Sequence, residues 1–73
     1  MTASEIVKSL SPGAREALTK VPGYPVAVGA KVETGALLAD ELRAAGVIGP
    51  RGGLSIKGAV VTDRLKAWAE AAL

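Results

Sequence analysis

The chain has 73 residues, of which 49% are hydrophobic and 22% charged, and its formal net charge is +2. A composition this apolar excludes intrinsic disorder, and a chain this short forms one domain with a thin core. The sequence contains no cysteine and no histidine, which excludes disulfide bonds, thiol nucleophiles and the usual zinc sites. Its mildly basic balance permits nucleic-acid binding without requiring it.

The first ten residues lack the apolar core of a signal peptide. Lys8 and Ser9 interrupt the apolar residues Ile6, Val7 and Leu10. No run approaches the roughly 20 apolar residues that a membrane-spanning helix needs. We therefore expect a cytoplasmic protein without a membrane segment.

Two helices are expected in the N-terminal part of the chain. Thr2 and Glu5 have the spacing of a capping box, which predicts a short first helix. Ser11 and Pro12 then begin a second helix, because serine is a favoured N-cap and proline suits the first helical position. The turn-forming segment 22–25 ends that helix.

The segment 26–32 gives two conflicting signals. Val26, Val28 and Val32 favour a strand by their β propensity. A helix-turn-helix motif would instead need a short helix here, which Gly29 weakens by about 1 kcal/mol relative to alanine. We expect a short, irregular helix or a turn.

An amphipathic helix is expected in the middle of the chain. Its apolar residues recur at helical spacing, which predicts one buried stripe. The members of that stripe are Leu37, Leu38, Leu42 and Ala45. Thr34 is the expected N-cap, and Gly46 the expected stop, because glycine enters the left-handed conformation at little cost.

Two short strands are expected after this helix. Val47 and Ile48 favour a strand because they are β-branched. Leu54 and Ile56 mirror them across the turn at 50–53, which predicts a β-hairpin.

The last helix is expected from about Ser55 to the C-terminus. Val61, Leu65 and Trp68 fall on one face of it. About 17 helical residues span roughly 25 Å, which is longer than a core of this size can cover. Trp68 is therefore expected either to pack against the first two helices or, with Leu73, to form a dimer interface.

The pattern from Leu10 to Leu65 resembles the winged helix-turn-helix domains of bacterial and phage regulators. The start at 10–12 looks like the beginning of their first core helix, and the segment 37–48 resembles a recognition helix followed by a wing strand. The segment 54–58 is similar to the step, often written L-T-x-K-G, that opens their last helix. The segment 36–50 also resembles the winged-helix domain at the end of bacterial DNA translocases.

The resemblance implies a mainly α winged helix-turn-helix fold with a small β-hairpin wing. It extends over the single domain 1–73, in which 1–10 form a short N-terminal helix. Residues 11–58 would hold the helix-turn-helix and the wing, and 55–73 the C-terminal helix.

The resemblance also implies double-stranded DNA as the partner of a regulator or recombination-accessory factor. The helix at 34–45 would enter the major groove, and the wing would contact the backbone or the minor groove. The expected DNA-binding residues are Lys31, Thr34, Gly35, Arg43, Arg51 and Lys57.

A winged-helix adaptor that binds a protein partner is the alternative. The recognition helix is acidic, with Glu33, Asp40 and Glu41 in or beside it, and the C-terminal end of the chain is apolar. Binding to a protein would be insensitive to salt, whereas binding to DNA weakens steeply as salt rises. No catalytic, metal or cofactor site is expected in either case, because the scattered carboxylates bring no titratable group into a pocket.

Overall fold

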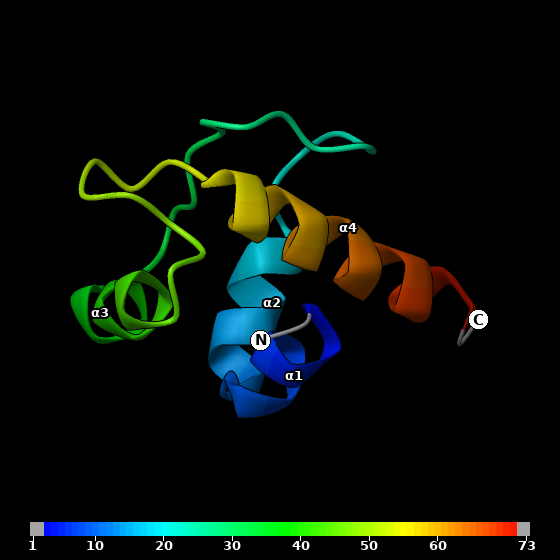
Figure 1. The fold of residues 1–73 in the computed structure, drawn as a ribbon, viewed down its shortest axis with the longest axis horizontal. Coiled ribbons are helices and arrows are strands. Elements are labelled where there is room, and N and C mark those ends of the chain that lie inside the picture. The colour runs from blue at the N-terminus through cyan, green and yellow to red at the C-terminus, as the bar shows by residue number, and fades with distance from the viewer. Residues whose placement is uncertain (1–2, 72–73) are drawn as a thin grey trace.

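The computed structural model describes residues 3–71, which form four helices and the loops between them. The helices are α1 (Ala3–Ser9), α2 (Pro12–Thr19), α3 (Ala36–Ala44) and α4 (Ile56–Ala71). Figure 1 shows α4 lying across α1 and α2, with α3 at one side of the molecule. The helix pairs in contact are α1 with α4, α2 with α4, and α2 with α3. Thr2 and Leu73, which were assigned to a cap and to a dimer interface, lie outside the described residues.

One hydrophobic core joins the helices to the loops that connect them. All four helices contribute to it, together with residues of the segments on either side of α3. Its largest fully buried side chains are Ile6, Leu18, Leu42, Val47, Leu54, Val61 and Thr62. The loops are therefore held by buried side chains and not by helix packing alone.

The predicted ends of α2 and α3 are confirmed at two positions. The Ser11 hydroxyl accepts a hydrogen bond from the Ala14 amide at 3.2 Å, and Pro12 is the first residue of α2. Gly46 follows α3 with φ +78°. The Val47 amide then donates to the Leu42 carbonyl at 3.1 Å, which completes a Schellman ending.

The predicted β-hairpin wing is wrong, because residues 3–71 contain only isolated antiparallel bridges and no strand. The bridges join Lys31 to Gly53 and Ile48 to Leu54. Ser55 explains why no second strand develops. Its hydroxyl donates to the Gly46 carbonyl at 2.7 Å and accepts from the Gly58 amide at 3.0 Å, and α4 begins at the next residue, Ile56.

The helix-turn-helix arrangement is also absent from the described part of the chain. The segment 26–32 forms an irregular stretch with a turn at Val28 and Gly29, and no helix lies between α2 and α3. α3 begins at Ala36 with Gly35 as its N-cap, so the expectation that Thr34 caps it is wrong. The structure is therefore a small, compact helical domain, and its described residues lack the expected β-hairpin wing.

Two large apolar side chains are more exposed to solvent than the sequence predicted. Leu37 is 86% exposed, while Leu42 is buried and Leu38 is half-buried. α3 packs mainly against α2, and Leu37 is about 140° around the helix from Leu42, so it cannot share that face. Trp68 is 45% exposed, which rules out a position in the core beside Val61.

No described helix has the length and apolar content needed to cross a bilayer.

Candidate nucleic-acid interface

A shallow hollow beside the turn that joins α3 to α4 brings together two of the predicted DNA-binding residues. We call it the cationic hollow, and it is lined by Gly29, Lys31, Gly49, Pro50, Arg51 and Gly53. Its volume is about 520 Å³. Lys31 comes from the loop before α3 and Arg51 from the turn after it, so two segments 20 residues apart in sequence (51 − 31) supply the cations.

Backbone pairing places Lys31 beside this turn. The Leu54 amide donates to the Ala30 carbonyl at 2.9 Å, and the Val32 amide donates to the Gly52 carbonyl at 3.0 Å. The pairing brings Gly53 so close to the other segment that a Cβ there would lie 2.8 Å from the Gly29 carbonyl oxygen. The glycines of the turn therefore permit the approach that puts Lys31 and Arg51 on one surface.

The cationic hollow carries positive charge without a neighbouring carboxylate in its lining. Both Lys31 and Arg51 are exposed. The ion pairs found among the described residues join Lys20 to Glu16 and Arg43 to Asp40, and neither includes Lys31 or Arg51. Lys31 and Arg51 are both cations, and an anion placed between them is attracted by both.

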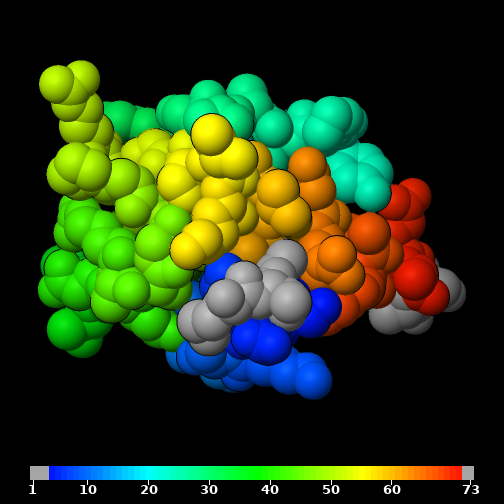
Figure 2. Space-filling model, viewed as in Figure 1, coloured from blue at the N-terminus to red at the C-terminus, as the bar shows by residue number. Residues whose placement is uncertain are grey.

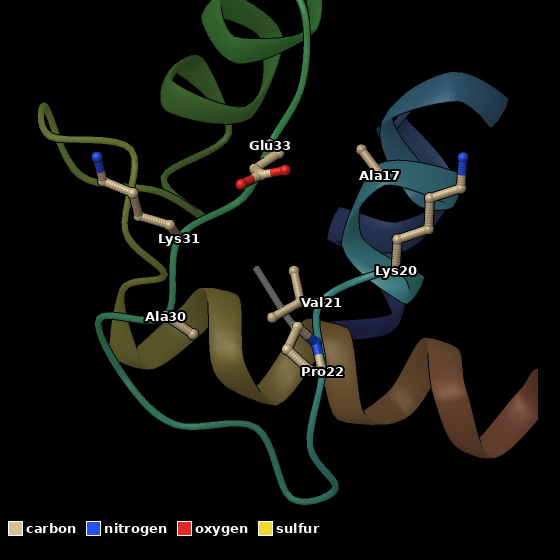
Figure 3. Close-up of a pocket in the computed structure, with 7 residues that line it drawn as sticks. All are labelled: Ala17, Lys20, Val21, Pro22, Ala30, Lys31 and Glu33. Atoms are coloured by element: carbon tan, nitrogen blue, oxygen red, sulfur yellow. The ribbon is translucent and has the colours of Figure 1, made fainter.

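Lys31 also borders a second concave surface, which we call the α2 groove. The α2 groove has a volume of about 460 Å³, and Figure 3 shows the seven residues that line it. Val21, Pro22 and Ala30 form its apolar side. Lys20 and Lys31 stand at its opposite rims, and the Glu33 carboxylate lies between them in this view. The α2 groove therefore extends the cationic surface toward Lys20 but places an acid within it.

The remaining predicted DNA-binding residues lie elsewhere. Thr34 is half-buried and Gly35 exposed at the start of α3. The Arg43 guanidinium donates to Asp40 on the same helix at 3.2 Å, which partly neutralises it. Lys57 lies near the end of α3, since a Cβ at Gly46 would be 3.7 Å from its ammonium nitrogen. The structure does not bring these residues into the cationic hollow, and their role in binding DNA stays a prediction.

Lys20 and Glu33 are the groove residues that the predicted site omitted. Lys20 is the C-cap of α2, and its position directly before the Val21-Pro22 break was the available signal. Lys66 is basic as well, but its ammonium group donates to the carbonyls of Val21 and Gly23 and so holds the loop after α2. It is engaged in the fold and is a poor candidate for contacting a ligand.

The surface offers two exposed cations that can bind an anion. Across residues 3–71, no three acidic side chains come together to share a metal ion. Glu41 is the described acid whose pKa is lowered, and it is hydrogen-bonded to Ser11 on α2, away from the cationic hollow. Comparison with models of protein families, with curated protein sequences and with solved structures finds no match to this chain.

Proposed function

We propose that this chain binds double-stranded DNA through the phosphate backbone, with Lys31 and Arg51 as the central contacts. The observation that carries the proposal is that these two exposed cations border one hollow whose lining contains no carboxylate. Glycine and proline make up the rest of that lining, so no bulky side chain obstructs a phosphate. Lys20 stands at the far rim of the α2 groove, where it pairs with Glu16 at 3.2 Å.

The proposed binding does not read base sequence. Direct readout needs side chains such as arginine, asparagine or glutamine that reach base edges. The exposed face of α3 presents Ala36, Leu37, Ala44 and the paired Asp40 and Arg43 instead. A backbone-binding accessory factor of bacterial or phage recombination therefore fits this surface better than a site-specific regulator, and we place its action in the cytoplasm.

Fluorescence anisotropy with a labelled random-sequence duplex tests the proposal. Two neutralised phosphates give a slope of about −2 when the logarithm of the binding constant is plotted against the logarithm of salt concentration. Lys31→Glu and Arg51→Glu are each expected to weaken binding about tenfold at low salt and to flatten that slope by about 1. Lys8→Glu is the matched control, because Lys8 is an exposed lysine of α1 that lines neither surface.

Two results would overturn the proposal. One is an absence of binding by the wild-type protein at the lowest salt concentration. The other is an equal loss of affinity in Lys8→Glu, Lys31→Glu and Arg51→Glu, since that would reflect net charge and not the cationic hollow.

A second candidate function is supported by Leu37. Leu37 is 86% exposed, and Ala36 and Ala44 of the same helix are exposed as well, so α3 offers apolar surface to a protein partner. Such an adaptor would retain its partner at high salt, where backbone binding to DNA is lost. Leu37→Ser would abolish that retention and leave the anisotropy titration with DNA unchanged, so the two functions are separated by one variant.

A further inference from the structure

The outer face of α4 carries an apolar stripe that the described structure leaves uncovered. With about 100° per residue, Ile56, Val60, Ala67 and Ala71 share one side of the helix. Ile56 is 75% exposed and Val60 51% exposed. Part of α4, in orange, forms the surface of the face shown in Figure 2.

The middle of this stripe has the shape that receives a side chain from another helix. A hollow of about 370 Å³ is lined by Val60, Asp63, Arg64, Ala67 and Trp68. The first four residues occupy positions i, i+3, i+4 and i+7 of the helix. Four residues in this arrangement form the hole into which one knob of a facing helix packs in a coiled coil. Asp63 and Arg64 line the middle of this hollow, so a helix that packs there has to offer charges that complement them.

Charged residues are sorted on the two sides of the stripe. At about 100° per residue, Lys57 and Arg64 fall on one side, and Asp63 and Glu70 fall on the other. Lys66 lies further round on the acidic side, where its ammonium group is already bound by the carbonyls of Val21 and Gly23. Charges that flank a helix contact determine which helix pairs with it and in which direction. A helix that carries the same arrangement is complementary to this one, provided that its basic side meets the acidic side.

We infer that α4 pairs with α4 of a second copy of this chain in a parallel two-fold dimer. When a two-fold axis runs along two parallel helices, the basic side of each meets the acidic side of the other. Arg64 then faces Asp63 of the partner subunit on both sides of the contact. An antiparallel pair would place acids against acids and bases against bases, which is unfavourable.

The existing contacts of these residues are compatible with the pairing. One Asp63 oxygen accepts from the Val26 amide at 2.9 Å, and a carboxylate has capacity for further hydrogen bonds. Arg64 donates to the Ser4 hydroxyl at 3.4 Å, a long contact that a carboxylate would replace with a shorter, charge-assisted one. α4 spans only about 24 Å, so the dimer is small and depends on protein concentration. The inference does not depend on DNA binding.

Sedimentation equilibrium over a range of concentrations tests for the dimer. The wild-type protein is expected to shift from monomer to dimer as concentration rises. Val60→Glu should weaken association at least tenfold while retaining the far-UV circular dichroism of the wild type. Leu37→Glu is the matched control, because Leu37 is 86% exposed on α3, which packs mainly against α2. A wild-type protein that stays monomeric, or a Val60→Glu variant that dimerises normally, overturns the inference.

Single cysteines test the direction of the helices, since the chain has none of its own. In a parallel pair, Ala71→Cys lies next to its own copy and should form a disulfide-linked dimer under mild oxidation. Ile56→Cys should do the same. If crosslinks form only when the two variants are mixed, the helices are antiparallel and the proposed arrangement is wrong.

Discussion

The Glu41 carboxylate of α3 accepts two hydrogen bonds from Ser11, at the start of α2. The backbone amide of Ser11 donates to one carboxylate oxygen at 2.7 Å, and its hydroxyl donates to the other at 2.7 Å. The same hydroxyl accepts from the Ala14 amide, so one serine caps α2 and binds α3. This pair of residues fixes how α3 is rotated against α2.

Stability should therefore depend on the ionisation of Glu41. The backbone amide of Ser11 and then its hydroxyl hold the pKa of Glu41 below its usual value of 4.5, because both stabilise the charged carboxylate. Since the folded-state pKa is the lower one, this contribution is present above pH 4.5 and is lost as pH falls through the folded-state value. Glu41→Gln should lower the urea midpoint at neutral pH and reduce its decline below pH 4.5.

Urea denaturation monitored at several pH values checks this prediction. Glu33→Gln serves as the control, because Glu33 is exposed and makes no contact with Ser11. If Glu41→Gln and the wild type lose stability in parallel as the pH falls, the contact with Ser11 does not determine the acid sensitivity.

The second prediction concerns Thr62, where a substitution should raise the stability that Glu41→Gln lowers. It is fully buried in α4, and its hydroxyl has no hydrogen-bond partner among the described residues. A buried hydroxyl without a partner is unfavourable, so Thr62→Val should raise the free energy of unfolding by about 1 kcal/mol. Thr19→Val at the end of α2 removes a hydroxyl that does have a partner, the Glu16 carbonyl at 2.8 Å, and should lower it by about 0.5 to 1 kcal/mol. Urea denaturation at neutral pH measures both, and a loss of stability in Thr62→Val would show that the hydroxyl is satisfied.

Gly58 gives the third prediction, because α4 passes very close to the chain after α3. A Cβ at Gly58 would lie 1.8 Å from the Val47 carbonyl oxygen, which no side-chain movement can relieve. Gly58→Ala should lower the free energy of unfolding by at least about 3 kcal/mol. Gly13→Ala in α2 should be neutral or stabilising by up to about 1 kcal/mol, since its Cβ would meet only Leu38 at 3.4 Å. Thermal unfolding distinguishes the two, and similar melting temperatures would contradict the close approach.

Local signals in the sequence were sufficient for the helix ends and insufficient for the wing. Ser11, Pro12 and Gly46 act through their own backbone geometry, so their roles were visible in the sequence. The expected wing depended on pairing of Val47 and Ile48 with Leu54 and Ile56, which only tertiary contacts decide. The Ser55 hydroxyl bonds at the start of α4, which begins at Ile56. Ile56 is therefore an exposed helical residue and not a strand residue.

The stripe expected on α3 was too wide. Leu38 and Leu42 have the i,i+4 spacing of one face, whereas Leu37 lies about 100° from Leu38 and about 140° from Leu42. The contact between Glu41 and Ser11 joins residues 30 apart in sequence and selects Leu38 and Leu42 for the inner face. The sequence predicts Lys31 and Arg51 as DNA contacts, but their position at one hollow depends on backbone contacts between distant segments.

The last prediction concerns the acid in the α2 groove. Glu33 lies between Lys20 and Lys31 and would repel a phosphate that passes from one lysine to the other. Glu33→Gln removes that charge and should tighten DNA binding by roughly two- to fivefold at low salt, since like charges several ångströms apart in water cost up to about 1 kcal/mol. The effect should shrink as added salt screens it.

The control for this change is Glu5→Gln on α1, which alters the net charge equally without touching the α2 groove. Anisotropy titrations of both variants against the same duplex measure the difference. A larger gain in Glu33→Gln than in Glu5→Gln means that the phosphate path continues from the cationic hollow to Lys20. Equal gains would mean that the DNA responds to total charge only, and the binding surface would then end at Lys31.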